Sequence, residues 1–361
     1  MPTVVIAPDS FKGSLSAREV AEAIADGWRS VRPDDELVLV PQADGGEGTL
    51  DAVEASVPGA VRRSAGEVTG PDGRPTPGEW LELPDGTAVV ELAQSSGLPL
   101  LRELDPLGAT TRGLGEVIRA ALDAGATSLV IGLGGSASTD GAAGALSALG
   151  LALLDEQGDL VAEGGRGLLD IVDVRRDALV LPPAGGVTLL TDVTAPLLGP
   201  TGAAAVFGPQ KGATPGQVAQ LDAALAHFAE LVGGDPTLPG TGAAGGAGYG
   251  FSAVWGARIV PGADRLAELS GLREAVARAD IVLSGEGRFD AQSLTGKVVG
   301  RVLALAAGRT TGVIAGQVTA EAGGWSASLT DLAGSVEAAM AETALWLRVA
   351  GARAAEELRP R

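Results

Sequence analysis

Short apolar runs alternate along the chain with longer segments in which apolar residues recur at helical spacing. The first run, residues 3–7, is followed by Val20, Ile24 and Trp28, which a helix places on one face. Similar runs predict further strands over residues 37–40, 128–135, 187–193, 279–287 and 310–317. Helical spacing predicts helices from about residue 49, after residues 110 and 140, over 216–232 and over 332–358. This alternation predicts an α/β protein with a largely parallel sheet.

The first helix has a defined start in the sequence. Ser16 and Glu19 form the Ser-x-x-Glu pattern of a capping box, in which each side chain satisfies a backbone N–H at the helix start. We therefore expect the helix to begin just after Ser16. Residues 9–14, "DSFKGS", then form a loop between the first strand and this helix.

A change of pattern predicts a domain boundary. Residues 66–78 are rich in glycine and proline and interrupt the succession of strands and helices. Two alternating runs follow, residues 79–83 and 87–93, joined by Pro-Asp-Gly, which predicts a β-hairpin. We place a boundary near residue 75. The length of 361 residues is consistent with two domains at about 150 residues each.

Composition narrows the classes of protein to which the chain can belong. Acidic residues outnumber basic ones 45 to 26, and the net charge of −19 repels nucleic acid and anionic membranes. No apolar run approaches the roughly 20 residues of a membrane span, and the N-terminus has no signal-peptide pattern. The absence of cysteine excludes disulfides and thiolate chemistry. We expect a cytoplasmic protein without nucleic-acid or membrane partners.

The three lysines of the chain, Lys12, Lys211 and Lys297, all lie in polar stretches that contain glycine. Asparagine is absent and the remaining basic residues are arginine, so the composition disfavours lysine and each one is informative. Isolated lysines are usually only solvated surface residues. The alternative is that each is a compact cation that meets an anion.

The loop after the first strand combines Asp9, Ser10, Lys12 and Ser14. The free N–H groups at the start of a helix favour an anion, and Lys12 adds a full charge there. The competing interpretation is local: Ser14 or Ser16 caps the helix and Asp9 forms a turn. Capping does not require Lys12 or Asp9, so we favour an anion-binding loop.

Acidic residues follow three of the other expected strands. Asp44 and Glu47 lie among glycines in "ADGGEG", Asp192 follows a strand in the segment that contains Lys211, and Asp290 follows the strand near residue 287. Carboxylates at a strand end suit a hard cation such as Mg²⁺, although an ordinary tight turn explains the "ADGGEG" loop equally well.

Residues 284–298, "SGEGRFDAQSLTGKV", place Glu286, Arg288 and Lys297 around Asp290. The ending resembles a P-loop. However, Ala291 stands where a P-loop has its first glycine, and Val298 stands where the Mg²⁺-binding hydroxyl belongs. We therefore exclude an ordinary P-loop nucleotide-binding site.

A glycine-rich loop, "GLGGSASTDG" at residues 132–141, lies between an expected strand and helix. Gly134, Gly135, Ser136 and Thr139 would present backbone and hydroxyl donors to phosphate. A glycine-rich loop by itself is weak evidence.

The chemistry that these loops favour is phosphoryl transfer. It requires cations against the phosphate oxygens, carboxylates for Mg²⁺ and a carboxylate that accepts the proton of the acceptor hydroxyl, and it needs neither histidine nor cysteine. The only histidine, His227, lies within an expected amphipathic helix rather than in a loop, so we do not expect it to be catalytic.

Seven segments in order resemble the bacterial glycerate kinase family of the two-domain α/β type: "APDSFKGSLSA", "ADGGEGT", "ELAQSSGL", "GLGGSASTDG", "DVTAPLLGPTGAAAVFGPQKGA", "GAAGG" and "SGEGRFDAQSLTGK". The resemblance covers nearly the whole chain. It implies ATP-dependent phosphorylation of D-glycerate to 2-phosphoglycerate, with Mg²⁺. It also implies a Rossmann- or flavodoxin-like parallel-sheet domain made by both chain ends, residues 1–75 and 280–361, with a mixed α/β domain, residues 76–279, inserted between them.

Two residues depart from the pattern of this family. Thr139 and Ala195 stand where the family usually has asparagine. Threonine can still donate a hydrogen bond, whereas alanine cannot. The chain contains no asparagine at all, so drift in composition explains both changes at least as well as lost activity.

Under this hypothesis Lys12 and Lys297 neutralise phosphate or the substrate carboxylate, and Arg288 grips that carboxylate in a bidentate manner. Asp44, Asp192 and Asp290 are the candidates for Mg²⁺ ligation and for the base, with Asp192 favoured as the base. We expect a monomer or homodimer. The alternatives are a kinase for another small hydroxy acid or sugar acid, and a sensor that binds an organic acid or nucleotide without catalysis.

Overall fold

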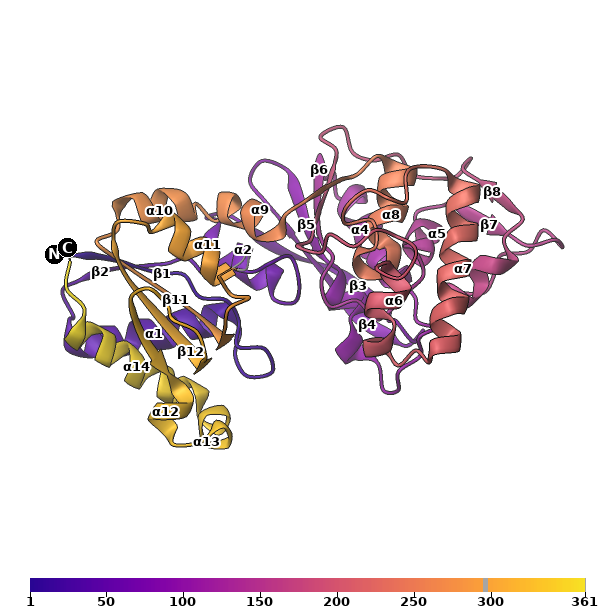
Figure 1. Ribbon diagram of the computed structural model, residues 1–361. Coiled ribbons are helices and arrows are strands. Elements are labelled where there is room, and N and C mark those ends of the chain that lie inside the picture. Colours follow the sequence, from indigo (N-terminus) through magenta and orange to yellow (C-terminus); the bar gives the residue numbers. More distant parts are fainter. Residues whose placement is uncertain (295–297, 361) are drawn as a thin grey trace. The chain divides into compact units, whose positions relative to one another are not determined.

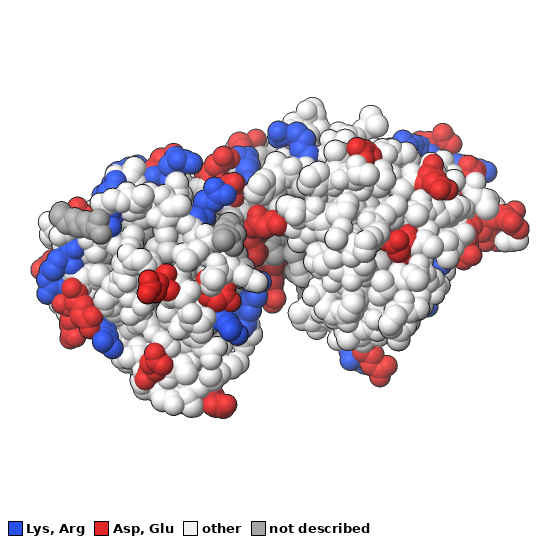
Figure 2. Space-filling view, in the orientation of Figure 1, with Lys and Arg blue, Asp and Glu red and all other residues white. Residues whose placement is uncertain are grey.

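We describe the fold from a computed structural model, in which residues 1–294 and 298–360 are described. Contacts between Cα atoms divide the chain into two units. Unit 1 comprises residues 1–44, 51–58 and 263–361, and unit 2 comprises residues 45–50 and 59–262. Acidic and basic side chains are interspersed on the drawn face of both units (Figure 2).

Unit 1 is built on a five-stranded sheet in which every neighbouring pair of strands is parallel. The strand order is β13-β12-β11-β1-β2, and both ends of the chain contribute (Figure 1). The strands are β1 (Thr3–Ile6), β2 (Glu36–Leu39), β11 (Ile281–Phe289), β12 (Thr310–Val318) and β13 (Trp325–Ser328). The expected α/β class and the parallel sheet from both chain ends are therefore confirmed.

Helices cover both faces of this sheet. On one face α1 (Ala17–Val31) packs beside α14 (Thr343–Glu357), as Figure 1 shows, and Val4 and Ile6 share a core with Ile24 and Trp28 of α1. On the other face Val5 shares a core with residues of α9, α10 and α11. Successive residues of β1 thus point to opposite faces. These three helices span Gly262–Leu269, Leu272–Arg278 and Val298–Leu305.

The strand order of unit 1 reverses between β1 and β11. The chain passes from β1 through α1 to β2 on one side, and from β11 through α11 to β12 on the other. Because such crossovers are right-handed, α1 and α11 lie on opposite faces. Open α/β sheets bind ligands at the carboxyl ends of the strands where the order reverses, so the loops after β1 and β11 mark the expected site.

Helix α1 begins as the sequence predicts. The Ser16 hydroxyl accepts a hydrogen bond from the backbone N–H of Glu19, and the Glu19 carboxylate accepts one from the backbone N–H of Ser16. The crossing of α1 and α14 requires glycine: a Cβ atom on Gly27 would collide with the carbonyl of Arg348, and one on Gly351 with that of Ile24.

The C-terminal helical segment is divided, which corrects the single helix expected over residues 332–358. It consists of α12 (Leu329–Ala333), α13 (Val336–Ala341) and α14. Gly334 ends α12 in the left-handed conformation at φ +85°. The hydroxyl of Ser335 then caps α13 by accepting from the N–H of Ala338.

Unit 2 contains a mixed six-stranded sheet in the order β10-β9-β6-β5-β4-β3. Strands β3, β4 and β5 pair antiparallel, which confirms the hairpin predicted around residue 85, and the remaining pairs are parallel. The strands are β3 (Val61–Thr69), β4 (Pro75–Glu82), β5 (Thr87–Glu91), β6 (Ser128–Gly132), β9 (Val187–Leu190) and β10 (Arg258–Val260). A separate antiparallel pair is formed by β7 (Ala152–Leu154) and β8 (Asp173–Arg175).

Helices of unit 2 share one core with this sheet. They are α3 (Leu92–Ser96), α4 (Arg112–Asp123), α5 (Ala143–Ala148), α6 (Ala203–Phe207), α7 (Pro215–Val232) and α8 (Ala243–Trp255), with short 3₁₀ turns at Leu98–Leu100, Gly165–Asp170 and Pro209–Lys211. Helix α2 (Thr49–Ser56) begins in unit 2 and continues in unit 1.

The boundaries of the units differ from those expected at residues 75 and 280. Strand β3 pairs along its length with β4 and so belongs to unit 2. Ala263 and Leu272, from α9 and α10, are buried with Val5 and so belong to unit 1. The glycine- and proline-rich residues 66–78 also do not interrupt the fold, because most of them lie in β3 and β4.

Candidate active site

The loop after β1 is held against the end of β11. The backbone N–H of Asp9 donates to the carbonyl of Gly285 at 2.8 Å, which extends the pairing of β1 beyond its last residue. Phe11 and Leu15 then exchange backbone hydrogen bonds of 2.9 and 3.1 Å across a tight turn. Gly13 provides the positive φ of +80° that this turn needs. The turn leaves Lys12 exposed at its tip.

Asp9 lies among like charges. Burial and, to a smaller extent, the carboxylates of Asp44 and Glu286 raise the pKa of the Asp9 carboxyl to about 7, although the hydrogen bond from the Ser10 N–H and the charge of Lys12 oppose the shift. Three carboxylates and one ammonium group therefore interact where β1, β2 and β11 end. A bound cation would offset this excess of negative charge.

This donor set fits Mg²⁺ bound together with phosphate. Among the described residues, no three acidic or histidine side chains gather closely enough to enclose a metal ion. Mg²⁺ usually keeps several waters and takes one or two carboxylates plus substrate phosphate oxygens rather than a complete protein cage. The oxygen ligands and negative charge around Asp9 and Asp44 meet that requirement.

The first residues after β11, 290–293, are held by contacts within the segment. The Asp290 carboxylate accepts from the backbone N–H groups of Gln292 and Ser293 at 2.9 and 3.3 Å, and its Oδ2 lies 3.8 Å from Nε of Arg288. The Arg288 side chain is 64% exposed, which leaves it accessible to a ligand. Lys297 lies outside the described residues.

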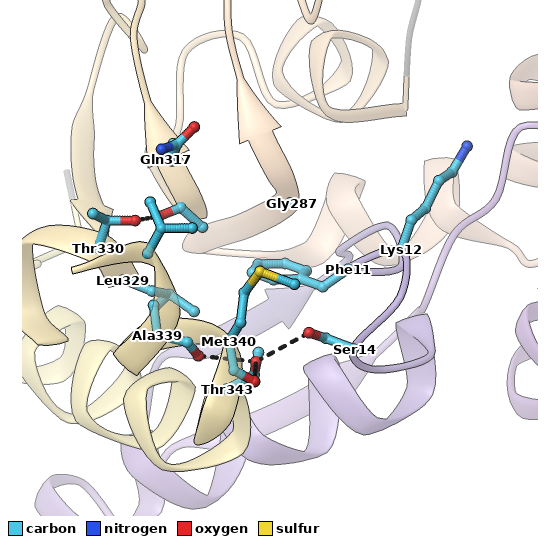
Figure 3. A pocket seen from close by; sticks show the side chains of 12 residues that line it. Phe11, Lys12, Ser14, Gly287, Gln317, Leu329, Thr330, Ala339, Met340 and Thr343 are labelled. Atoms are coloured by element: carbon cyan, nitrogen blue, oxygen red, sulfur yellow. Dashed lines mark hydrogen bonds between the residues drawn. The ribbon is translucent and has the colours of Figure 1, made fainter.

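A pocket of about 250 Å³ opens beside Lys12 in unit 1. The loop after β1, the carboxyl ends of β11 and β12, and helices α12, α13 and α14 contribute its lining (Figure 3). Lys12 and Ser14 are the sequence-predicted site residues that line it. This pocket thus adjoins the carboxylate cluster through the loop that carries Lys12.

The glycine-rich loop of unit 2 binds a buried lysine. Lys211 is only 1% exposed, and its Nζ donates to the hydroxyl of Ser136 at 2.9 Å and to the carbonyl of Ser138. Burial lowers the pKa of the Lys211 ammonium to about 8, and the charge of Asp140 opposes that shift. Lys211 thus donates to the protein's own loop, and that it also meets an anionic ligand stays a prediction.

Asp140 organises the end of the same loop. Its carboxylate accepts from the N–H and hydroxyl of Thr111 at 2.9 and 2.8 Å, from the hydroxyl of Ser138 at 3.0 Å and from the N–H of Gly144 at 3.3 Å. Burial is the largest influence and raises the pKa of Asp140 despite these hydrogen bonds. Thr139 is fully buried beside it, and in the described part of the chain no group pairs with its hydroxyl.

The loop hydroxyls are therefore turned inward, whereas two glycines remain accessible. Gly135 is exposed and Gly134 is half-buried. Gly134 donates its N–H to the carbonyl of Gly45 at 3.0 Å, and a Cβ atom on Gly134 would collide with the backbone of Gly46. The loop thus packs directly against residues 45–50, which belong to the same unit.

The glycerate kinase family model matches residues 4–359 of this chain. The chain belongs to the glycerate kinase family. Family membership makes it a kinase, and it confirms the resemblance found in the sequence.

Individual relatives agree with this family assignment. Glycerate 2-kinase of Escherichia coli K12 is 44% identical over 306 residues, which are 82% of this chain and 79% of that protein. A glycerate kinase of Haemophilus influenzae is 44% identical over 304 residues, covering 81% of this chain and 79% of that protein. A crystal structure from Salmonella typhimurium LT2, provisionally assigned as glycerate kinase 2, superposes with a TM-score of 0.84 at 39% identity and covers 98% of this chain and 97% of its own.

Within this glycerate kinase fold, the predicted site residues fall into two groups. Unit 1 holds Asp9, Ser10, Lys12, Ser14, Asp44, Glu286, Arg288 and Asp290, and unit 2 holds Gly134, Gly135, Ser136, Thr139, Asp192 and Lys211. Asp192 is exposed and accepts from the N–H of Gly262 at 2.9 Å. That all the aspartates act at one site stays a prediction.

Two buried acids of this family member were not among the predicted site residues. Glu91, 6% exposed, accepts from the N–H groups of Gly48 and Leu50 at 3.2 and 3.0 Å and so orders the start of α2. Asp140 is the other. Both residues lie between the end of a strand and the start of a helix, in segments that resemble the family. That position is the signal from which they could have been predicted. The Nε2 of His227 pairs with the carbonyl of Ile171, consistent with a structural role.

Proposed function

We propose that this chain transfers the γ-phosphoryl group of ATP to D-glycerate, with Mg²⁺, to give 2-phosphoglycerate. The observation that carries the proposal is the grouping of Asp9, Asp44, Glu286 and Lys12 where the strand order of unit 1 reverses. The relatives named as glycerate kinases supply the substrate class.

The proposed reaction needs charge and a proton acceptor. A hydroxyl oxygen of glycerate forms a bond to the γ-phosphorus, the bond from that phosphorus to the bridging oxygen breaks, and ADP leaves. Lys12 would face the phosphate oxygens during transfer, and Arg288 would bind the substrate carboxylate in a bidentate manner. A carboxylate would accept the hydroxyl proton.

Asp44, Asp192 and Asp290 remain our candidates for Mg²⁺ ligation and for the base. Asp44 interacts with a second carboxylate, Asp9, so we favour Asp44 for the metal. When bound, Mg²⁺ would neutralise charge on the transferred phosphoryl group. Lys297, Lys211, Ser136, Gly134, Gly135 and Thr139 stay candidates for binding phosphate or substrate.

ADP formation tests the activity directly. The purified chain would be assayed with ATP and Mg²⁺ against a panel of D-glycerate, L-glycerate, lactate, tartrate and gluconate. We expect D-glycerate to have the highest kcat/KM, and we expect no ADP release above background without an acceptor or with excess chelator. A higher kcat/KM for another acid would replace D-glycerate by that acid. Absence of turnover with every acceptor would contradict the proposed kinase activity.

The position of the new phosphate can be determined by phosphorus NMR. A phosphate on the secondary hydroxyl couples to one carbon-bound proton and gives a doublet, whereas a phosphate on the primary hydroxyl couples to two and gives a triplet. We expect the doublet. A triplet would assign 3-phosphoglycerate as the product.

We further propose that the enzyme is a cytoplasmic monomer or homodimer that acts on small-molecule substrates. Over the described residues, no helix is both long enough and apolar enough to cross a bilayer.

A further inference from the structure

The pocket beside Lys12 lies where a parallel sheet normally binds a ligand. Gly287 of β11 and Gly316 and Gln317 of β12 line it at the carboxyl ends of these strands, and Lys12 belongs to the loop after β1. Glycine at two adjacent strand ends leaves the backbone open to close approach by a flat group. A Cβ atom on Gly316 would collide with the backbone of Gly287, so the packing of the two strands requires glycine there, whereas a Cβ atom on Gly287 would meet only Phe11, at 4.0 Å.

The interior of the pocket is apolar. Phe11, Leu329, Val336, Ala339 and Met340 contribute to its lining, and Figure 3 shows Phe11, Leu329 and Met340 directed toward a common space. An aromatic ring and a thioether offer polarisable surfaces on which a planar ring can stack. Glycerate, in which every carbon carries oxygen, has little apolar surface to bury there.

The polar groups of the pocket differ in what they can still bind. Thr330 donates its hydroxyl to the carbonyl of Gly316 at 2.8 Å, and Thr343 donates to the carbonyl of Ala339 at 3.0 Å. Across the described residues, no group hydrogen-bonds the side-chain amide of Gln317, which is half-buried at the rim. That amide offers both a donor and an acceptor, the pair that recognises the edge of adenine.

We propose that this pocket binds the purine ring of the nucleotide that donates the phosphoryl group. The proposal rests on the proposed kinase activity and adds the location of the base. A volume of about 250 Å³ lies below the roughly 300–1,000 Å³ of pockets that enclose a whole drug-sized ligand, so it suits a ring system rather than a complete nucleotide. Gln317 and Lys12 lie on opposite sides in Figure 3, so a base held near Gln317 extends its phosphates toward Lys12.

Calorimetric titration with ADP, inorganic diphosphate and inorganic triphosphate, without any acceptor, tests the base site. Two variants change the pocket: Gln317→Leu removes the amide, and Ala339→Leu fills space. The matched controls are Gln157→Leu and Ala304→Leu, which alter exposed residues outside the pocket lining. Melting curves establish that each variant is folded, and Gln317→Leu changes only a half-buried side chain.

We expect both pocket variants to weaken ADP binding about tenfold or more, since a good hydrogen-bonded or stacked base contributes about 1–3 kcal/mol. Binding of inorganic triphosphate should be unchanged, and the controls should match the wild type. Wild-type ADP binding no tighter than that of inorganic diphosphate would overturn the proposal, as would unchanged ADP affinity in folded Gln317→Leu. This titration contains no acceptor, so it tests the base site independently of the substrate. If the pocket variants weaken ADP binding but D-glycerate is not phosphorylated, the pocket is correctly assigned and the proposed substrate is wrong.

Discussion

The loop after β1 and the loop after β6 look alike in sequence and differ in structure. Each follows a buried strand, contains glycine and hydroxyl residues, and involves one of the three lysines. Lys12 is exposed beside carboxylates that repel one another, whereas Lys211 is 1% exposed and donates to the loop itself. Burial therefore separates the two lysines: Lys12 is accessible to solvent, whereas Lys211 holds the loop after β6 through its hydrogen bonds.

Replacement of Lys211 should have the largest effect on stability. Lys211→Met removes the donor to Ser136 and Ser138 and leaves Asp140 without its nearby cation. Each hydrogen bond to a charged group contributes about 1.5–3 kcal/mol, and Lys211 makes two of them. We expect the free energy of unfolding, measured in urea, to fall by about 3 kcal/mol or more, whereas Lys12→Met should change it by less than about 0.5 kcal/mol. Equal stability of the two variants would remove the distinction between the lysines.

Replacement of Lys12 should have the largest effect on turnover. Lys12→Met removes the ammonium group that we propose faces the developing phosphate charge, and loss of one such donor costs about 100-fold or more in kcat. ADP formation with D-glycerate measures it. Arg348→Met, which alters an exposed cation on α14, is the control and should keep wild-type kcat. Wild-type kcat in Lys12→Met would assign Lys12 to the solvated surface.

Two threonines of the second loop provide a matched pair. Thr111 donates its hydroxyl to Asp140 at 2.8 Å and accepts from Ala145, whereas the buried Thr139 hydroxyl has no partner in the described part of the chain. Thr111→Val should therefore lower the free energy of unfolding by about 1–3 kcal/mol. Thr139→Val should leave it unchanged or raise it. A larger loss of stability in Thr139→Val than in Thr111→Val, measured by urea titration, would contradict this difference between the two hydroxyls.

Asp9 should make the stability of the chain depend on pH. In the folded chain the pKa of Asp9 is raised from 3.8 to about 7. Between these values the folded state holds a proton that the unfolded chain has released, so this carboxyl makes the free energy of unfolding fall as the pH rises. The Asp9→Asn variant should melt a few degrees higher than the wild type at pH 8. Near pH 4 the two should melt at the same temperature. Asp34→Asn, exposed in the same unit, should show no such difference. An increase in melting temperature that is the same at pH 4 and pH 8 would contradict the raised pKa of Asp9.

Much of the fold was predictable from local signals. The apolar runs located β1, β6, β9 and β11, the Ser16–Glu19 pattern fixed the start of α1, and Pro-Asp-Gly fixed the turn between β4 and β5. These features depend on neighbouring residues alone, and the pattern of apolar residues records them directly.

Strand β3 and helix α8 were missed because other parts of the chain determine them. Only Val68 of β3 is buried, so the strand shows no apolar alternation, and its pairing with β4 is displaced by an irregularity between Ser64 and Gly66. Helix α8 contains glycines that disfavour an isolated helix. A Cβ atom on Gly250 would collide with the carbonyl of Gly141, so close packing selects glycine there.

The candidate site was predictable in its residue types but not in their burial. The sequence identified Lys12, Asp9 and Asp44, which interact in unit 1. It could not distinguish Lys211 from Lys12, because burial depends on the packing of a loop against a distant turn. Asp140 was missed for the same reason, since its partners Thr111 and Gly144 come from separate elements.

The central claim, that an ammonium group at position 12 is required for phosphoryl transfer, can be tested by chemical restoration. The chain contains no cysteine, so Lys12→Cys introduces a single thiol, which 2-bromoethylamine converts to an aminoethyl side chain of nearly the length of lysine. ADP formation with D-glycerate is measured before and after this treatment. The account predicts near-absent turnover in Lys12→Cys and recovery of a large part of the wild-type rate after aminoethylation. Turnover that is unaffected by the substitution, or that stays absent when the thiol is fully modified and the chain is folded, would contradict it.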